Sequence, residues 1–144
     1  TRSERRAVRE YGWLLGLAFQ LVDDALDYSG SERDLGKAPL TDVAEGKLTL
    51  PLIATLKRCS TGERDAISSL LKDFALQSAA GRSPDRESVQ RVAECVERHR
   101  GVESALARAQ LLGGQARSQI EPFVDCEAKH AMLALADFVV GRQS

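Results

Sequence analysis

The sequence predicts an all-α protein. Apolar residues recur at helical spacing, as at Ile67, Leu71 and Phe74, and Gly and Pro residues fall between the periodic segments. The one apolar stretch that resembles a strand, residues 48–56, contains Pro51, which a central strand tolerates poorly. With 43% hydrophobic and 28% charged residues, the 144 residues are enough to form one compact core.

The N-terminal part of the chain is expected to hold one long helix, a loop and a short helix. The long helix covers residues 3–28 and ends before Gly30, which supplies a C-terminal stop. Residues 31–46 are polar and contain turn-forming residues, so a loop is expected there. Thr49 is well placed as an N-cap, and the proline two residues later suits a first helical turn. These signals predict a helix over 50–59.

Four further helices are expected in the remainder of the chain. They run from Thr61 to a small polar stretch at 77–83, from Ser83 to about His99, from just after Gly101 to about Ile120, and from Asp125 to Val140. Ser83 and Pro84 are typical of an N-cap followed by a first turn, and Gly101 is expected to stop the helix that they open. The pair Gly113-Gly114 is expected to interrupt the next helix and to mark either a kink or close packing, because each Gly costs about 1 kcal/mol relative to Ala.

Composition narrows the classes of function. The net charge is −1, from 20 basic and 21 acidic residues, so no overall field attracts nucleic acid or an anionic membrane. No run of 18 apolar residues and no signal segment occurs, so neither a membrane span nor secretion is expected. The three cysteines (Cys59, Cys95 and Cys126) are far apart, which favours reduced thiols in a cytoplasmic protein.

The most informative motif is Asp23-Asp24-Ala25-Leu26-Asp27, directly after the apolar run of residues 14–22. On a helix Asp23 and Asp27 project from one face, and like charges at that spacing repel each other. The alternative to a ligand-binding motif is a solvated acidic helix end. The preceding run is apolar nearly all round, however, so we expect it to be buried. Carboxylates that enter a core need a cation, and hard oxygen ligands suit Mg²⁺, which the sequence therefore predicts here.

The motif belongs to a longer pattern. Phe19-Gln20 precedes the aspartates, Gly36-Lys37 follows about ten residues later, and Glu45-Gly46-Lys47-Leu48-Thr49-Leu50-Pro51-Leu52 comes next. In this order the elements resemble the second aspartate-rich region of the trans-type polyprenyl diphosphate synthases. The segment 135–142 is similar to the last helix of that family. One departure occurs at 39–42, Pro-Leu-Thr-Asp, where members often have a Gly and an acidic residue.

The resemblance implies the fold and the extent of the domain. The fold would be the antiparallel helix bundle of the isoprenoid synthases. The family's first aspartate motif, its Arg-rich segment and its Lys-Thr pair have no counterpart in this chain, so residues 1–144 are expected to be the C-terminal part of a single synthase domain. That part is expected to be inactive alone, and the complete enzyme to form a homodimer. Product length is set beside the first motif and is not readable here.

The resemblance and the chemistry of prenyl diphosphates assign the same roles to these residues. Ionisation of the substrate leaves negative charge on the departing diphosphate, which metal ions and fixed lysines stabilise. The expected Mg²⁺ ligands are Asp23, Asp24 and Asp27, the diphosphate contacts are Gln20, Lys37 and Lys47, and Phe19 would lie near the hydrocarbon or in the core. The substrates would be isopentenyl diphosphate and an allylic prenyl diphosphate, joined head to tail into an all-trans chain.

Two other functional readings stay open, together with several weaker candidates. The chain could belong to a non-catalytic subunit of a heteromeric synthase, or to a helical diphosphate-binding module or terpene-cyclase-like relative that only ionises its substrate. The arginines Arg2, Arg5, Arg6 and Arg9 follow helical spacing; they could face a phosphate or a subunit partner, but the pattern favours a solvated face. His99 and His130 are expected at the surface or at helix ends, without metal partners. Tyr28 is expected to pack, and Arg142 receives no role.

Overall fold

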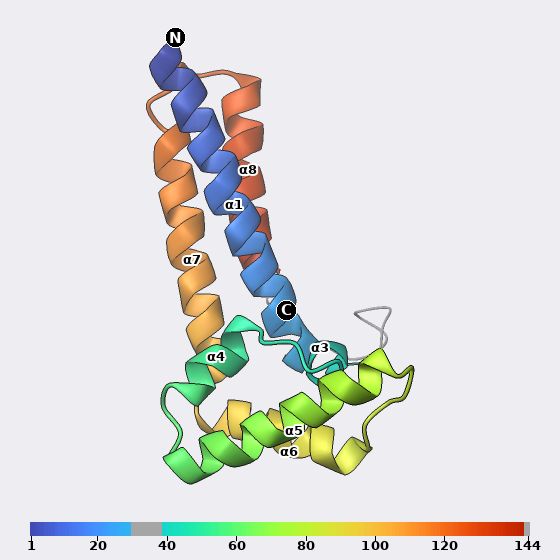
Figure 1. Ribbon diagram of the computed structural model, residues 1–144. Coiled ribbons are helices and arrows are strands. Elements are labelled where there is room, and N and C mark those ends of the chain that lie inside the picture. Colours follow the sequence, from blue (N-terminus) through green and yellow to red (C-terminus); the bar gives the residue numbers. More distant parts are fainter. Residues whose placement is uncertain (30–38, 143–144) are drawn as a thin grey trace. The chain divides into compact units, whose positions relative to one another are not determined.

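The computed structural model describes residues 1–29 and 39–142 (Figure 1). Every regular element within these residues is a helix, as predicted. The helices are α1 (Arg2–Ser29), α3 (Thr41–Ala44), α4 (Leu50–Leu56), α5 (Thr61–Ala79), α6 (Arg86–Arg98), α7 (Gly101–Ile120) and α8 (Glu127–Gly141). None of these described helices combines the length and the apolar character that crossing a bilayer requires.

The chain divides into two compact units. The first comprises residues 1–23 and 106–144, and the second comprises residues 24–105, so the division falls inside α1 and inside α7. Each unit has its own buried apolar cluster. The predicted Asp23-Asp24 pair lies at the division itself.

Three helical segments form the first unit, and they pack through small side chains. Ala18 of α1, Ala116 of α7 and Ala136 of α8 are almost fully buried, which lets the helix backbones approach closely. Tyr11 of α1 donates a hydrogen bond from its hydroxyl to the Met132 carbonyl at 2.7 Å. Within this unit α7 runs antiparallel to α1 and α8 (Figure 1). The expected antiparallel bundle is therefore present.

The second unit is built around α5 and α6. Its core contains apolar residues from four helices: Val43, Leu52, Ile67, Leu71, Phe74, Val89, Val92, Cys95 and Val96. The helix starts carry the expected signals. Ser60 and Glu63 form a capping box at the start of α5. The Asp85 side chain accepts from the Ser88 N–H at 2.8 Å at the start of α6.

Several boundaries differ from the predicted ones. The N-cap of α6 is Asp85 instead of Ser83, because the acidic side chain reaches the free N–H three residues later. Gly101 begins α7 instead of ending α6. The left-handed residue at that junction is Arg100, with φ of 54°. A Cβ atom on Gly101 would lie 2.3 Å from the Pro51 carbonyl oxygen, so close packing, not chain termination, requires Gly there.

Two further expectations were wrong. The helix α7 runs through Gly113-Gly114 without interruption, but the close packing that the pair was expected to mark is present at Gly113, where a Cβ would lie 2.6 Å from Val140 Cγ1. The apolar run before the aspartates is not buried all round. Ala18 and Val22 are fully buried, but Leu17 is 40% exposed, because α1 packs along one face only in this chain.

Candidate functional site

The aspartate motif lies in the last two turns of α1. Its apolar neighbours Val22 and Ala25 are buried and fix the orientation of this part of the helix. Asp23 and Asp24 are half-buried, whereas Asp27 is fully buried. Two carboxylates of the motif therefore reach solvent in this structure, and the third is enclosed.

Asp27 connects α1 to the segment that follows the loop. Its Oδ2 accepts a hydrogen bond from the Asp42 backbone N–H at 3.0 Å, and its carbonyl oxygen accepts one from the Leu40 N–H at 2.9 Å. The Asp42 N–H lies in the first turn of α3, where no intrahelical partner exists. The N-cap residue Leu40 makes no side-chain cap, so the Asp27 carboxylate serves that purpose from another helix. Its role as a metal ligand stays a prediction.

Leu40 lies in the segment 39–42, where the sequence departs from the family pattern. Its φ is 61° and its ψ is 25°, in the left-handed region that favours Gly. Its side chain packs against the core cluster of the second unit. A leucine therefore makes this left-handed bend, and its apolar contacts offset part of the strain. The predicted loop over 31–46 was incomplete, because residues 41–44 form the short helix α3.

Lys47 is held by two carboxylates. Its Nζ lies 2.9 Å from Asp42 Oδ1 and 2.6 Å from Glu45 Oε2, and its side chain is 56% exposed. Hydrogen bonds to Glu45 and Asp42 raise the pKa of Lys47, so the ammonium is charged at neutral pH. Asp42 thus touches both predicted site regions: its N–H contacts Asp27 and its carboxylate contacts Lys47.

Gly46 lets the Lys47 segment lie against α5. Its φ is 74°, and a Cβ atom there would lie 2.7 Å from the Leu71 carbonyl oxygen and 2.8 Å from the Ala75 nitrogen. Neither backbone atom can move without disturbing α5. The Gly of the Glu-Gly-Lys element is therefore required both by its conformation and by its surroundings.

Tyr28 packs, as expected, and its hydroxyl lies 3.1 Å from Thr49 Oγ1. Burial raises the pKa of Tyr28 to about 12, so the phenol is neutral at physiological pH. Thr49 holds the predicted N-cap position of α4 but makes no side-chain cap. Its hydroxyl joins α4 to the end of α1 instead, a contact that the sequence pattern did not reveal.

Phe19, Gln20 and the four N-terminal arginines are all exposed on α1. Phe19 is 44% exposed, so the interpretation that it belongs to the core is wrong. The Arg142 guanidinium lies 5.0 Å from the centre of the Phe19 ring, a contact that the sequence did not predict. Gln20 is also exposed. The four arginines at residues 2–9 are exposed, in agreement with a solvated face. Lys37 lies outside the described residues.

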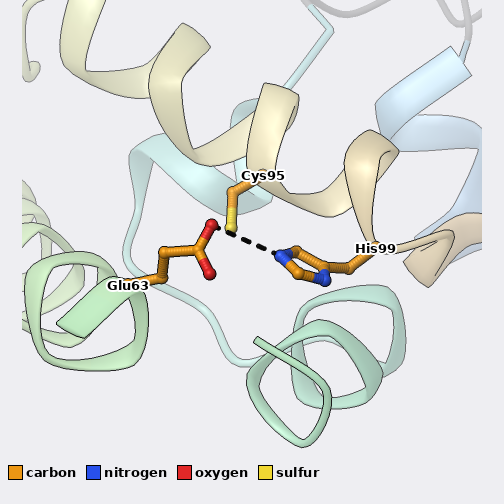
Figure 2. A group of neighbouring side chains, drawn as sticks. All are labelled: Glu63, Cys95 and His99. Carbon is orange, nitrogen blue, oxygen red and sulfur yellow. Dashed lines mark hydrogen bonds and ion pairs between the residues drawn. The ribbon is translucent and has the colours of Figure 1, made fainter. Parts of the chain in front are cut away.

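The prediction that His99 lies at a helix end is confirmed, because it is the C-cap of α6, but the expectation that no potential metal ligand lies near it was wrong. Its Nε2 lies 3.5 Å from Glu63 Oε1, and Cys95 lies one helical turn before it (Figure 2). A Cys and a His four residues apart on one helix were the available signal. His130 is exposed, as expected, and its Nε2 lies 2.6 Å from Asp125 Oδ1. All three cysteines are free thiols.

Comparisons with known proteins place these residues in context. A family model described as polyprenyl synthetase matches residues 1–83. The short chain isoprenyl diphosphate synthase of Methanothermobacter thermautotrophicus is 35% identical over 140 residues, covering 97% of this chain and 40% of that protein. The octaprenyl diphosphate synthase of Haemophilus influenzae is 34% identical over 142 residues, covering 99% of this chain and 40% of that protein.

Solved structures also resemble the whole chain. The crystal structure of polyprenyl synthase from Caulobacter crescentus, complexed with calcium and isoprenyl diphosphate, has a TM-score of 0.84 at 30% identity. The match covers 100% of this chain and 42% of that one. The chain thus spans about 40% of the length of the curated relatives it matches.

Proposed function

Because the chain belongs to the polyprenyl synthetase family, we propose that it is the C-terminal part of a prenyltransferase that joins isopentenyl diphosphate to an allylic prenyl diphosphate. The all-α bundle predicted from the sequence is confirmed, and it is the fold of the polyprenyl synthases. The names of the similar proteins support the reaction class, since they are isoprenyl and octaprenyl diphosphate synthases.

The observation that carries the proposal is the connection from Asp27 through Asp42 to Lys47. Two hydrogen bonds of 3.0 and 2.9 Å join the buried carboxylate at the end of α1, the Asp42 residue and the exposed ammonium. The last carboxylate of the motif and a lysine from a separate part of the sequence are thereby held in one compact unit. Reactions that release diphosphate need both kinds of group, because metal ions and cations stabilise the leaving charge.

The donor set on α1 fits a hard divalent cation, for which we propose Mg²⁺. Asp23 and Asp24 are half-buried carboxylates near the end of α1, and Mg²⁺ typically takes one or two carboxylates, several waters and phosphate oxygens. We also assign Asp27 to the ligand set, although its Oδ2 already accepts the Asp42 N–H. When bound, the cation would act as a Lewis acid toward the diphosphate oxygens. The calcium and isoprenyl diphosphate bound by the Caulobacter crescentus protein support this assignment.

The chain's own residues would bind and neutralise the diphosphate. The C–O bond of the allylic substrate breaks with its electron pair on the diphosphate, the isopentenyl double bond attacks the carbon that is released, and a proton is lost. Lys47 would face the diphosphate, and its exposed Nζ must exchange Asp42 or Glu45 for a phosphate oxygen. Gln20 and Lys37 would make further phosphate contacts, and Phe19 would lie beside the hydrocarbon.

The proposal also requires further protein around the first unit. Several large apolar side chains of this unit are exposed, among them Trp13 at 66% and Phe138 at 65%. Such side chains support a larger assembly, in which the rest of the synthase domain and a second subunit would cover them. We therefore propose that the full-length enzyme is a homodimer and that the 144-residue chain is inactive alone. The three free thiols favour the cytoplasm as its location.

The test uses the full-length protein that contains this chain. Labelled isopentenyl diphosphate and farnesyl diphosphate are incubated with Mg²⁺ or with EDTA, and products are separated by chain length. We expect Mg²⁺-dependent elongation that Asp23→Ala abolishes and that Asp73→Ala, an exposed position on α5, leaves intact. Absence of elongation with several allylic primers would refute the proposal. Release of diphosphate without elongation would indicate an ionisation-only enzyme, and no reaction at all would indicate a partner subunit.

A further inference from the structure

Three side chains of different chemistry meet between α5 and α6, in the second unit. Glu63 comes from the first turn of α5, while Cys95 and His99 come from the last turn and the C-cap of α6 (Figure 2). One oxygen, one sulfur and one nitrogen of these residues all lie within 4.8 Å of one another. Among the residues that the structure describes, this is the one group of three such side chains that gathers in this way.

The position of Glu63 is fixed by the capping box. Its Oε2 accepts hydrogen bonds from the Ser60 N–H at 3.1 Å and from the Ser60 hydroxyl at 2.9 Å. Its Oε1 is thereby turned toward His99, at 3.5 Å from Nε2. These hydrogen bonds lower the pKa of Glu63 to about 2, so the carboxylate is charged at neutral pH. Arg98 shares Oε1 at 2.7 Å and is the competitor for any other cation.

The other two groups have the burial expected of ligands on a rigid support. Cys95 is 3% exposed and belongs to the core cluster of the second unit, and the His99 side chain is 20% exposed. A pocket of about 210 Å³ is lined by Glu63, Cys95 and Arg98 and leads to the solvent. An ion could therefore reach Glu63 and Cys95 without opening the core, and the His99 side chain, which does not line this pocket, is itself partly exposed.

We propose that Glu63, Cys95 and His99 form a binding site for a borderline-soft divalent cation, for which Zn²⁺ is the best fit. Thiolate, imidazole and carboxylate together are typical zinc ligands, whereas Mg²⁺ prefers oxygen alone. Ligand atoms of a tetrahedral zinc site lie about 3.3–3.8 Å apart, given bonds of about 2.0–2.3 Å. Side-chain adjustments of about 1 Å would bring the three atoms to these separations, and water would complete the coordination from the pocket.

The proposed site is distinct from the aspartate motif and does not depend on the proposed prenyl transfer. Its ligands join the N-terminus of α5 to the C-terminus of α6, so a bound ion would link two helices that share the core. A ligand that binds only the folded state stabilises it by mass action, and a higher melting temperature is expected with the metal. Burial raises the pKa of the Cys95 thiol, so metal binding would release a proton.

Titration of the intact, chelator-treated chain with Co²⁺ tests the proposal. A thiolate-bound cobalt ion gives a charge-transfer band in the near ultraviolet and visible bands typical of tetrahedral coordination, and Zn²⁺ should abolish both. We expect one site per chain. Cys95→Ser should remove the charge-transfer band, and His99→Gln should weaken the affinity roughly tenfold or more. Excess Mg²⁺ should leave the bands unchanged.

The chain offers a matched control, because Cys126 and His130 have the same spacing. Cys126→Ser and His130→Gln should leave the cobalt spectrum unchanged. No bands at micromolar Co²⁺ would overturn the proposal, as would bands that survive Cys95→Ser or disappear with Cys126→Ser. If Cys95→Ser proves unfolded by circular dichroism, His99→Gln decides, since His99 is partly exposed at the end of its helix. Unchanged affinity in that folded variant would also refute the site.

Discussion

Gly46 provides the sharpest test of how the Lys47 segment is held. Replacement by Ala adds a single methyl group at a residue with φ of 74°. That methyl group would lie 2.7 Å from the Leu71 carbonyl oxygen, 2.8 Å from the Ala75 nitrogen and 2.9 Å from the Ala75 Cβ. All three distances are far below van der Waals contact, and two of the partners are backbone atoms of α5. Relief therefore requires movement of a helix or of residues 45–47.

The expected cost has two parts that can be separated. Holding a non-Gly residue in the left-handed region costs about 1–2 kcal/mol. Overpacking of a close contact adds about 1–3 kcal/mol. Gly46→Ala should therefore lower the free energy of unfolding by about 2–5 kcal/mol, which for a chain of this size lowers the melting temperature by roughly 4–20 °C.

Two other glycines separate the two contributions. Gly81 has φ of 67° but no atom within 4 Å of an added Cβ, so Gly81→Ala should cost only the conformational part, about 1–2 kcal/mol. Gly114 lies inside α7 with open space around it, so Gly114→Ala should stabilise the protein by up to about 1 kcal/mol. Urea unfolding of the three variants beside the parent measures these differences. If Gly46→Ala costs no more than Gly81→Ala, the argument from close approach to α5 is refuted.

Three further predictions concern the residues around Asp27 and Lys47. Asp27→Ala should lower the free energy of urea unfolding by about 2–3 kcal/mol, because it removes a buried hydrogen bond to a charged group. Asp23→Ala should lower it by less than about 1 kcal/mol. Equal losses for the two variants would contradict the anchoring role of Asp27. The pKa of about 12 for Tyr28 means that the folded protein keeps this proton while the unfolded chain loses it above pH 10. The free energy of unfolding should thus fall between pH 10 and 12. Melting curves at several pH values should show a smaller fall for Tyr28→Phe than for the parent, and the difference should be at most about 2.7 kcal/mol. Lys47→Gln in the full-length protein should lower kcat/KM for the allylic substrate by roughly tenfold or more, while Lys72→Gln, exposed on α5, should not; matching kinetics for both variants would exclude Lys47 from the diphosphate site.

Helix positions were readable from the sequence because local signals determine them. The α5 start at Thr61 follows directly from the Ser60 and Glu63 capping box, and α4 begins at Leu50 behind Thr49, as predicted. Ends were less predictable wherever tertiary contacts override local preference. At the junction of α6 and α7 the left-handed residue is Arg100, and the neighbouring Gly101 is reserved for close contact with Pro51. A sequence pattern cannot distinguish these two uses of Gly.

The sequence proposes the residue types of the candidate site but not the contacts between them. The motif predicts that Asp27 and Lys47 belong to one site, and the structure shows that Asp42 contacts both of them. Asp42 was visible in the sequence only as part of a departure from the family pattern. Its importance comes from its contacts with Lys47, five residues later, and with Asp27, fifteen residues earlier. Both contacts require the bend at Leu40. Such a bend is set by packing, since a leucine does not favour it.

The group formed by Glu63, Cys95 and His99 shows most clearly why sequence spacing alone cannot predict a metal site. The sequence holds a Cys followed four residues later by a His twice, at Cys95 and at Cys126. Cys95 lies within the last turn of α6, so the four-residue spacing brings its side chain to the same face as His99. Cys126 is the extended N-cap of α8, with φ of −164°, so the helical rule does not apply to it. A third ligand from another helix is also needed. Glu63, 32 residues before Cys95, lies beside the other two because its capping box with Ser60 fixes the Glu63 rotamer. Identical spacing therefore yields a candidate metal site only where the helix register and a distant helix start agree.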